Sequence, residues 1–307
     1  MNDMNRREFV ERAAAAAGGV ALAGVAPQER RVRRWPTTVR LGRTGIRTSL
    51  LGIGTGTRGW NKQSNQTRLG QQQFTALVRH ALDNGVRLFD CADMYGSHSY
   101  LREALKGVPR HRYVLLTKTA HRQADEVRAD IDRFRQELGV DMIDIVLMHV
   151  VTEPDWNVRY RGVMEVLEEA RSRRTIRAHG CSCHSFQALE AAAADPWVQV
   201  NLARLNPWGR MMDEKPGEPA ARAPELVRPV LERMRAAGKG VLGMKILAEG
   251  RAVRGEDRGE RIRESVRFAV STGTMDAMVI GFESIQQFDE VLRELRAAVA
   301  DVGLRVA

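Results

Sequence analysis

Residues 114–149 read VLLTKTAHRQADEVRADIDRFRQELGVDMIDIVLMH, and this stretch decides the fold. It contains a short aliphatic run, Val114–Thr117, a segment of helical periodicity, Ala124–Leu138, and a second aliphatic run, Ile143–Met148. Gly139 follows the helical segment, as expected of a residue that ends a helix with positive φ. This order predicts two parallel strands joined by a crossover helix.

The same alternation of strand and helix repeats from residue 38 onward. Eight units in about 260 residues favour a closed (β/α)8 barrel, or TIM barrel, over an open doubly wound sheet. An open dinucleotide-binding sheet would need a Gly-x-Gly-x-x-Gly turn after its first strand, whereas the glycines of residues 52–56 belong to the strand itself. The predicted strands are Leu50–Gly54, Arg87–Phe89, Val114–Thr117, Ile143–Met148, Arg177–Cys181, Val198–Leu202, Val241–Met244 and Ala277–Ile280. The predicted helices are Gln71–Asn84, Tyr100–Leu105, Ala124–Leu138, Gly162–Arg173, Phe186–Ala194, Glu225–Ala237, Gly259–Ser271 and Ile285–Val299.

A short hairpin is expected before the first unit. In Leu41–Ser49, Gly42 and Gly45 bracket a polar turn, which indicates a β-hairpin that plugs one end of the barrel. The barrel domain is therefore expected to span residues 38–307, with this N-terminal hairpin as its first part.

Residues 1–37 have the pattern of a signal peptide followed by a charged linker. The pair Arg6–Arg7 is followed by Phe9, and then by the Ala/Gly/Val run Ala13–Ala26, which ends near a small-residue cleavage motif at Ala21–Ala23. The run is too short for a membrane span, which needs roughly twenty residues. The arginine pair resembles the bacterial twin-arginine signal, which predicts export to the periplasm by that machinery and no stable membrane span after processing. The alternative is a cytoplasmic protein in which the arginine pair arose by chance.

Charge and cysteine content exclude several classes of function. The formal charge of +10 is spread along the chain without a basic stripe interleaved with aromatic residues, so no nucleic-acid partner is expected. The three cysteines cannot build a disulfide framework. The Cys-Ser-Cys-His run at residues 181–184 lacks the second ligand pair that a zinc site would need, so we expect no metal.

Polar side chains follow three consecutive predicted strands. Asp90 follows the second strand, with Tyr95 five residues later, while Lys118 follows the third strand and His149 the fourth. In a (β/α)8 barrel the C-terminal strand ends form the active-site face, and neighbouring strands lie about 5 Å apart. Each of the four residues alone has a structural explanation, but together they predict a catalytic tetrad.

The tetrad suits the reduction of a carbonyl group, because hydride transfer to the carbon leaves an alkoxide that needs a proton. Tyr95 is the expected proton donor. The ammonium group of Lys118 would stabilise its phenolate, and Asp90 would keep that ammonium charged and oriented. His149 would hydrogen-bond the carbonyl oxygen.

The chain resembles the aldo/keto reductases across roughly residues 38–300. Asp90 to Gly96, DCADMYG, resembles that family's Asp-x-Ala-x-x-Tyr signature, and Lys118 and His149 complete its tetrad. Residues 41–49, LGRTGIRTS, are similar to its N-terminal hairpin. The resemblance implies an NAD(P)H-dependent oxidoreductase that reduces an aldehyde or ketone, a small-molecule carbonyl substrate.

The resemblance also implies a nucleotide site, although several positions depart from the family's usual residues. Ser182 matches, whereas Cys183 replaces the usual Asn, Leu202 the usual Gln and Gln287 the usual Arg. Family frequency places NADP(H) ahead of NAD(H). The predicted cofactor-binding residues are Gly54, Thr55, Ser182, Cys183, Lys245 (the charge of the expected phosphate-binding loop), Leu247, Gly281, Gln287 and Glu290, the last near adenine.

Loops after the first, second and sixth strands are expected to shape the substrate pocket through Trp60, Asn61, His98 and Trp208. Two other functions remain open. A nucleotide-binding or redox-sensing regulatory protein could keep the same barrel and tetrad with little turnover. A barrel hydrolase or lyase that needs no cofactor is the third possibility.

Overall fold

A computed structural model of the protein describes residues 38–302. The predicted signal peptide and linker, residues 1–37, lie outside this range, so export by the twin-arginine machinery stays a prediction. Within the described range, no helix combines the length and the apolar character that crossing a membrane requires.

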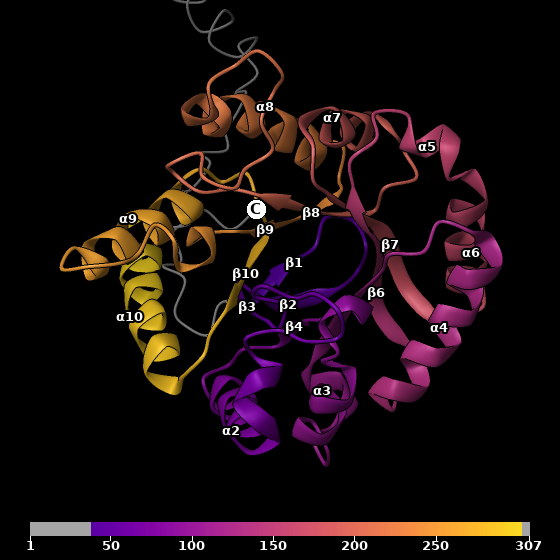
Figure 1. Ribbon diagram of the computed structural model, residues 1–307, viewed down its shortest axis with the longest axis horizontal. Coiled ribbons are helices and arrows are strands. Elements are labelled where there is room, and N and C mark those ends of the chain that lie inside the picture. Colours follow the sequence, from indigo (N-terminus) through magenta and orange to yellow (C-terminus); the bar gives the residue numbers. More distant parts are fainter. Residues whose placement is uncertain (1–37, 303–307) are drawn as a thin grey trace, which may run out of the picture. The chain divides into compact units, whose positions relative to one another are not determined.

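Eight parallel strands close into a barrel in the order β10-β3-β4-β5-β6-β7-β8-β9. They form the inner ring of the domain, and the helices surround them (Figure 1). This confirms the predicted (β/α)8 fold. The strands are β3 (Leu51–Gly54), β4 (Leu88–Asp90), β5 (Val114–Thr119), β6 (Ile143–Val151), β7 (Ile176–Cys183), β8 (Val200–Arg204), β9 (Gly240–Met244) and β10 (Ala277–Gly281).

All eight predicted helices are present, each within a few residues of its expected bounds. Two of them are followed by a glycine in the left-handed region, namely Gly139 with φ +67°, as predicted, and Gly238 with φ +80°. The short helix α5 was not predicted. The helices are α2 (Gly70–Asp83), α3 (His98–Ala104), α4 (Ala124–Leu138), α5 (Trp156–Arg159), α6 (Arg161–Ser172), α7 (Phe186–Ala194), α8 (Ala223–Ala236), α9 (Arg258–Ser271) and α10 (Ile285–Val302).

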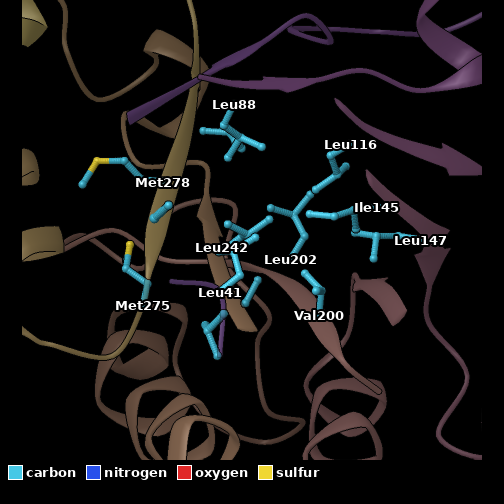
Figure 2. Close-up of a cluster of buried hydrophobic side chains, with 14 of the residues drawn as sticks. Leu41, Leu88, Leu116, Ile145, Leu147, Val200, Leu202, Leu242, Met275 and Met278 are labelled. Atoms are coloured by element: carbon cyan, nitrogen blue, oxygen red, sulfur yellow. The ribbon is translucent and has the colours of Figure 1, made fainter. Parts of the chain in front are cut away.

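Aliphatic side chains from different strands fill the barrel interior (Figure 2). Leu88, Leu116, Ile145, Leu202 and Leu242 are each at most 1% exposed, and they come from five different strands. Burying such a side chain stabilises the fold by roughly 1.5–3 kcal/mol. Because this layer is closed, a ligand can reach only the two ends of the barrel.

The predicted N-terminal hairpin covers one of these ends. It pairs β1 (Thr38–Arg40) with β2 (Arg47–Ser49) in antiparallel register. Leu41 is fully buried and belongs to the interior cluster (Figure 2). Gly42 has φ +47°, and a Cβ atom there would lie 2.4 Å from the carbonyl oxygen of Gly238, so only glycine fits. The open end, formed by the C-terminal ends of the strands, is called the mouth below.

Six of the eight strands extend further toward the mouth than the sequence indicated, while β3 and β9 end at the predicted residues. Asp90 is the last residue of β4, while Lys118 and His149 lie within β5 and β6. All three were expected just after their strands. The ladder of backbone hydrogen bonds holds Asp90 and Lys118, so their side chains project from rigid strands. His149 lies in a bulge of β6, between Met148 and Val151, where the register with β7 shifts.

Candidate active site

Asp90 and Lys118 form a buried ion pair at the mouth. The Lys118 ammonium donates hydrogen bonds to the Asp90 carboxylate and, at 2.9 Å, to the carbonyl oxygen of Cys91. The side chains of Lys118 and Asp90 are only 1% and 8% exposed. Burial opposes the charged ammonium, but the neighbouring acidic groups, Asp90 first and then Tyr95, more than offset this effect and raise the pKa of Lys118. The lysine therefore carries its charge at neutral pH.

Tyr95 and His149 meet above this ion pair. The Tyr95 hydroxyl lies 3.1 Å from His149 Nε2, and the Lys118 ammonium lies 5.1 Å from the centroid of the Tyr95 ring. Burial, together with the positive charge of Lys118, lowers the pKa of His149 well below its usual value, so the imidazole is neutral. The structure thus brings all four residues of the predicted tetrad together.

The acidity of Tyr95 differs from the sequence-based expectation. Burial raises its pKa to about 12, and the opposing effect of Lys118 does not cancel this shift. The phenol is therefore fully protonated at neutral pH. Lys118 opposes this shift in the pKa of Tyr95, but it does not make the resting phenol more acidic than usual.

Two glycines after β3 create the space for the Tyr95 ring. A Cβ atom on Gly56 would lie 2.2 Å from the ring, and one on Gly59 would lie 2.3 Å from it. Tyr95 itself ends a short 3₁₀ turn, Asp93–Tyr95, that follows β4. The glycine cluster is visible in the sequence, but its contact with the tyrosine was not predicted, since that contact joins segments separated by about 35 residues.

His98 does not reach the substrate side of the mouth, contrary to the prediction. It is 3% exposed, and its ring nitrogens bond Glu137 at 2.6 Å and Thr117 at 2.7 Å. Both nitrogens are therefore engaged between α3, α4 and β5. Arg133 bonds Glu137 and also Asp93, so this network anchors the segment that carries Tyr95.

The two predicted tryptophans lie in the expected loops. Trp60 follows β3 and is 70% exposed, and its neighbour Asn61 is also exposed. Trp208 is half-buried and packs against the core. Their contact with a substrate stays a prediction.

A pocket extends from Asp90 and Tyr95 across the loops that follow β9 and β10. It encloses about 920 Å³ of empty space, part of it open to solvent. The loop after β9 is tightly curved, with positive φ at Lys245, Ala248, Glu249 and Gly250, a feature common in ligand-binding loops. The predicted cofactor-binding residues that line this pocket are Gly54, Lys245, Leu247, Gly281 and Gln287.

Thr55 and Glu290, also predicted to bind the cofactor, are engaged elsewhere. Thr55 is fully buried, and its hydroxyl bonds the Asp90 carbonyl and Ser97. Glu290 accepts a 2.8 Å hydrogen bond from Arg258. Arg258 itself lines the pocket, and it was not predicted because it lies on α9, outside the usual strand-end positions.

Ser182 and Cys183 face opposite sides of β7, as alternation along a strand requires. The Ser182 hydroxyl is fully buried without a hydrogen-bond partner, and Ser182 is not among the residues that line the pocket. Cys183 is fully buried, with its sulfur 3.3 Å from Asn201 Oδ1 and 3.6 Å from the Cys181 sulfur. The structure therefore does not bring Cys183 to the pocket. Leu202, which stands at the family's Gln position, belongs to the apolar interior (Figure 2).

Residues 51–306 match the sequence model of the "Aldo/keto reductase family". The chain belongs to this family. Among curated aldo/keto reductases and related proteins, it is 31% identical over 192 residues to 6-dehydroglucose reductase of Novosphingobium aromaticivorans, covering 56% of this chain and 59% of the relative. It is 28% identical over 188 residues to the aldo-keto reductase YhdN of Bacillus subtilis, covering 56% and 54%. The chain thus aligns with a little over half the length of these relatives.

Solved aldo/keto reductase structures share the fold. A candidate aldo-keto reductase from Pseudomonas aeruginosa superposes with a TM-score of 0.70 at 22% identity, covering 89% of this chain and all of the other. The holo form of the aldo-keto reductase AKR11C1 from Bacillus halodurans gives 0.64 at 17% identity, covering 88% and 97%. At these identities the likeness concerns the fold alone.

Proposed function

We propose that the protein is an NAD(P)H-dependent reductase of aldehydes or ketones in which Tyr95 donates the proton. One observation carries the proposal: the Tyr95 hydroxyl lies 3.1 Å from a neutral His149, and the buried Lys118–Asp90 pair lies beside the Tyr95 ring. Membership of the aldo/keto reductase family supports the same reaction class.

The four side chains have different roles toward the carbonyl oxygen of the substrate. The Tyr95 hydroxyl and His149 Nε2 lie side by side, so a carbonyl oxygen placed next to both atoms can accept a hydrogen bond from each. As negative charge develops on that oxygen, the Tyr95 proton moves to it, because an alkoxide is a much stronger base than a phenolate. The Lys118 ammonium stabilises the phenolate that remains, and Asp90 holds the ammonium in place.

The residues around the pocket fit a nicotinamide nucleotide. When bound, a reduced nicotinamide supplies the hydride for the carbonyl carbon. The unpartnered hydroxyl of Ser182 is suited to its amide group. The curved loop after β9 and the guanidinium of Arg258 are suited to the phosphates, because exposed backbone N–H groups and cations bind anions.

The proposal predicts multiple-turnover oxidation of NADPH or NADH in the presence of small aldehydes and quinones. The measurement is the loss of nicotinamide absorbance over many enzyme equivalents, with enzyme omitted as the control. Nucleotide binding without turnover on any carbonyl would contradict the proposal and favour a nucleotide-binding regulatory protein. Absence of any nicotinamide fluorescence change on mixing would favour a reaction without this cofactor.

NADP(H) stays the first choice of nucleotide, and Arg258, which a phosphate would have to draw from its pair with Glu290, supplies the cation that Gln287 lacks. Arg258→Met is therefore expected to weaken NADPH binding about ten- to hundredfold, since a hydrogen-bonded ion pair with a phosphate contributes roughly 1.5–3 kcal/mol. NADH binding should change much less. Fluorescence titration of both nucleotides measures this, with the exposed Arg251→Met as the control. Equal losses for the two nucleotides would contradict the assignment.

A further inference from the structure

Arg204 is a cation at the mouth that the tetrad does not use. It ends β8, two residues after Leu202, whose side chain points into the barrel interior (Figure 2). Alternation along the strand places Arg204 on the same inner face, one layer closer to the mouth. Ser182 of β7 pairs with Leu202, so His184 lies level with Arg204, and the guanidinium contacts His184 Nδ1.

The partners of Arg204 leave its charge incompletely compensated. Burial, together with the nearby guanidinium, lowers the pKa of His184 to about 3, so this contact is with a neutral ring. Asp213 is the only nearby carboxylate among the described residues, 3.6 Å from the guanidinium, and neither of its oxygens has a hydrogen-bond partner. Burial raises the pKa of Asp213 to about 7, so part of the population is uncharged at neutral pH. Arg204 Nε is buried and also lacks a partner.

The other cations near the mouth are engaged by neighbouring acids or, in the case of Arg122, by the backbone carbonyls of His149 and Val150. Lys118 bonds Asp90, and Lys245 bonds Glu249. The side chain of Arg204, by contrast, is 19% exposed, and the carboxylate of Asp213 lies 3.6 Å from its guanidinium. An incoming anion would therefore find its free donors at Arg204.

Arg204 also lies at a defined position relative to the reacting oxygen. The rings of His184 and His149 have their centroids 6.2 Å apart, and His149 contacts the Tyr95 hydroxyl. A molecule whose carbonyl oxygen contacts both Tyr95 and His149 would need to reach past His184 to meet the guanidinium. The 6.2 Å between the two rings is comparable to the reach of two or three methylene groups and a carboxylate, and it exceeds the reach of the directly attached carboxylate of a 2-oxo acid.

We propose that Arg204, supported by His184, binds the carboxylate of an anionic carbonyl substrate, in which two or three methylene groups separate the carboxylate from the carbonyl group. The inference rests on the proposed reductase function. Arg204 then selects for anionic substrates. The carboxylate of the substrate competes with that of Asp213 for the Arg204 guanidinium.

The test compares 4-oxobutanoate with butanal, two four-carbon aldehydes that differ in the carboxylate. The parent is expected to show a higher kcat/KM for 4-oxobutanoate. In Arg204→Met the ratio of the two kcat/KM values should fall about ten- to hundredfold, and Arg204→Lys should restore part of it. Arg210→Met, an exposed arginine of the loop after β8, is the matched control and should leave the ratio unchanged. Asp213→Asn should raise the ratio, an increase that a merely structural role would not produce.

A second measurement separates the failure of this inference from the failure of the proposed function. Binding of butanoate to the full protein loaded with nucleotide is followed by ligand-detected NMR, without any turnover. Butanoate binding that is lost in Arg204→Met and strengthened in Asp213→Asn supports the inference even if no carbonyl is reduced. Turnover of butanal with no preference for 4-oxobutanoate, or with a ratio that Arg204→Met leaves unchanged, overturns it while the reductase function stands.

Discussion

Tyr95→Phe is expected to lower kcat/KM for carbonyl reduction by a factor of about 10²–10⁴, the usual contribution of a general acid. The substitution removes one oxygen atom from a ring held between Gly56 and Gly59, so the packing of the ring should persist. The nucleotide dissociation constant should therefore change little. Single-turnover kinetics measures the first quantity, and fluorescence titration measures the second.

Tyr113→Phe provides the control for this substitution. Tyr113 lies immediately before β5, at the opposite end of that strand from Lys118, with its ring against Arg110. Loss of its hydroxyl should leave kcat/KM within a factor of about two, because it lies far along the strand from the mouth. A Tyr95→Phe enzyme as fast as the parent would remove Tyr95 from the proton-transfer step.

The barrel and the tetrad could be predicted because both depend on periodic, local features. A buried parallel strand is aliphatic almost throughout, and the residue that ends each run stands out as polar, as Asp90 and His149 do. Their convergence then follows from closure of the barrel. The same reasoning explains why several strands were predicted to end too early. The first polar residue was expected to lie outside the strand, whereas Asp90 and Lys118 still belong to it.

The loops and the ligand contacts could be predicted only in part, because a loop side chain takes its direction from tertiary neighbours. His98 follows Tyr95 by three residues, yet it turns away from the mouth to bond Glu137 and Thr117. Arg258 reaches the pocket from helix α9, whereas the sequence predicted site residues at the ends of strands.

Cys183 is a predicted site residue, and the direction of its side chain depends on where its strand ends. Adjacent residues of a strand face opposite sides, so Ser182 and Cys183 cannot both point to the mouth while they remain in regular β structure. The strand was expected to end at Cys181, and it continues to Cys183. A two-residue error in the end of a strand therefore changed the direction of a predicted site residue.

Lys118→Met is expected to lower the free energy of unfolding by about 3–5 kcal/mol, because it leaves the Asp90 carboxylate buried without its counter-charge. Lys118 is 1% exposed, so water cannot replace the lost partner. Reduction should also be lost, since nothing then stabilises the Tyr95 phenolate. Urea denaturation followed by circular dichroism measures the stability change. Arg161→Met, which breaks an exposed pair with Glu165, should cost at most about 1 kcal/mol.

The double variant Asp90→Asn with Lys118→Met separates the cost of an unpaired charge from the cost of altered packing. It removes both buried charges while nearly preserving side-chain volume, so it should recover most of the stability that Lys118→Met loses. It should nevertheless remain inactive, because the cation beside Tyr95 is still missing. A double variant no more stable than Lys118→Met would show that lysine packing, rather than the Asp90 charge, sets the cost. Recovery of stability without activity would instead show that this pair is kept for its position beside Tyr95, at little net benefit to the fold.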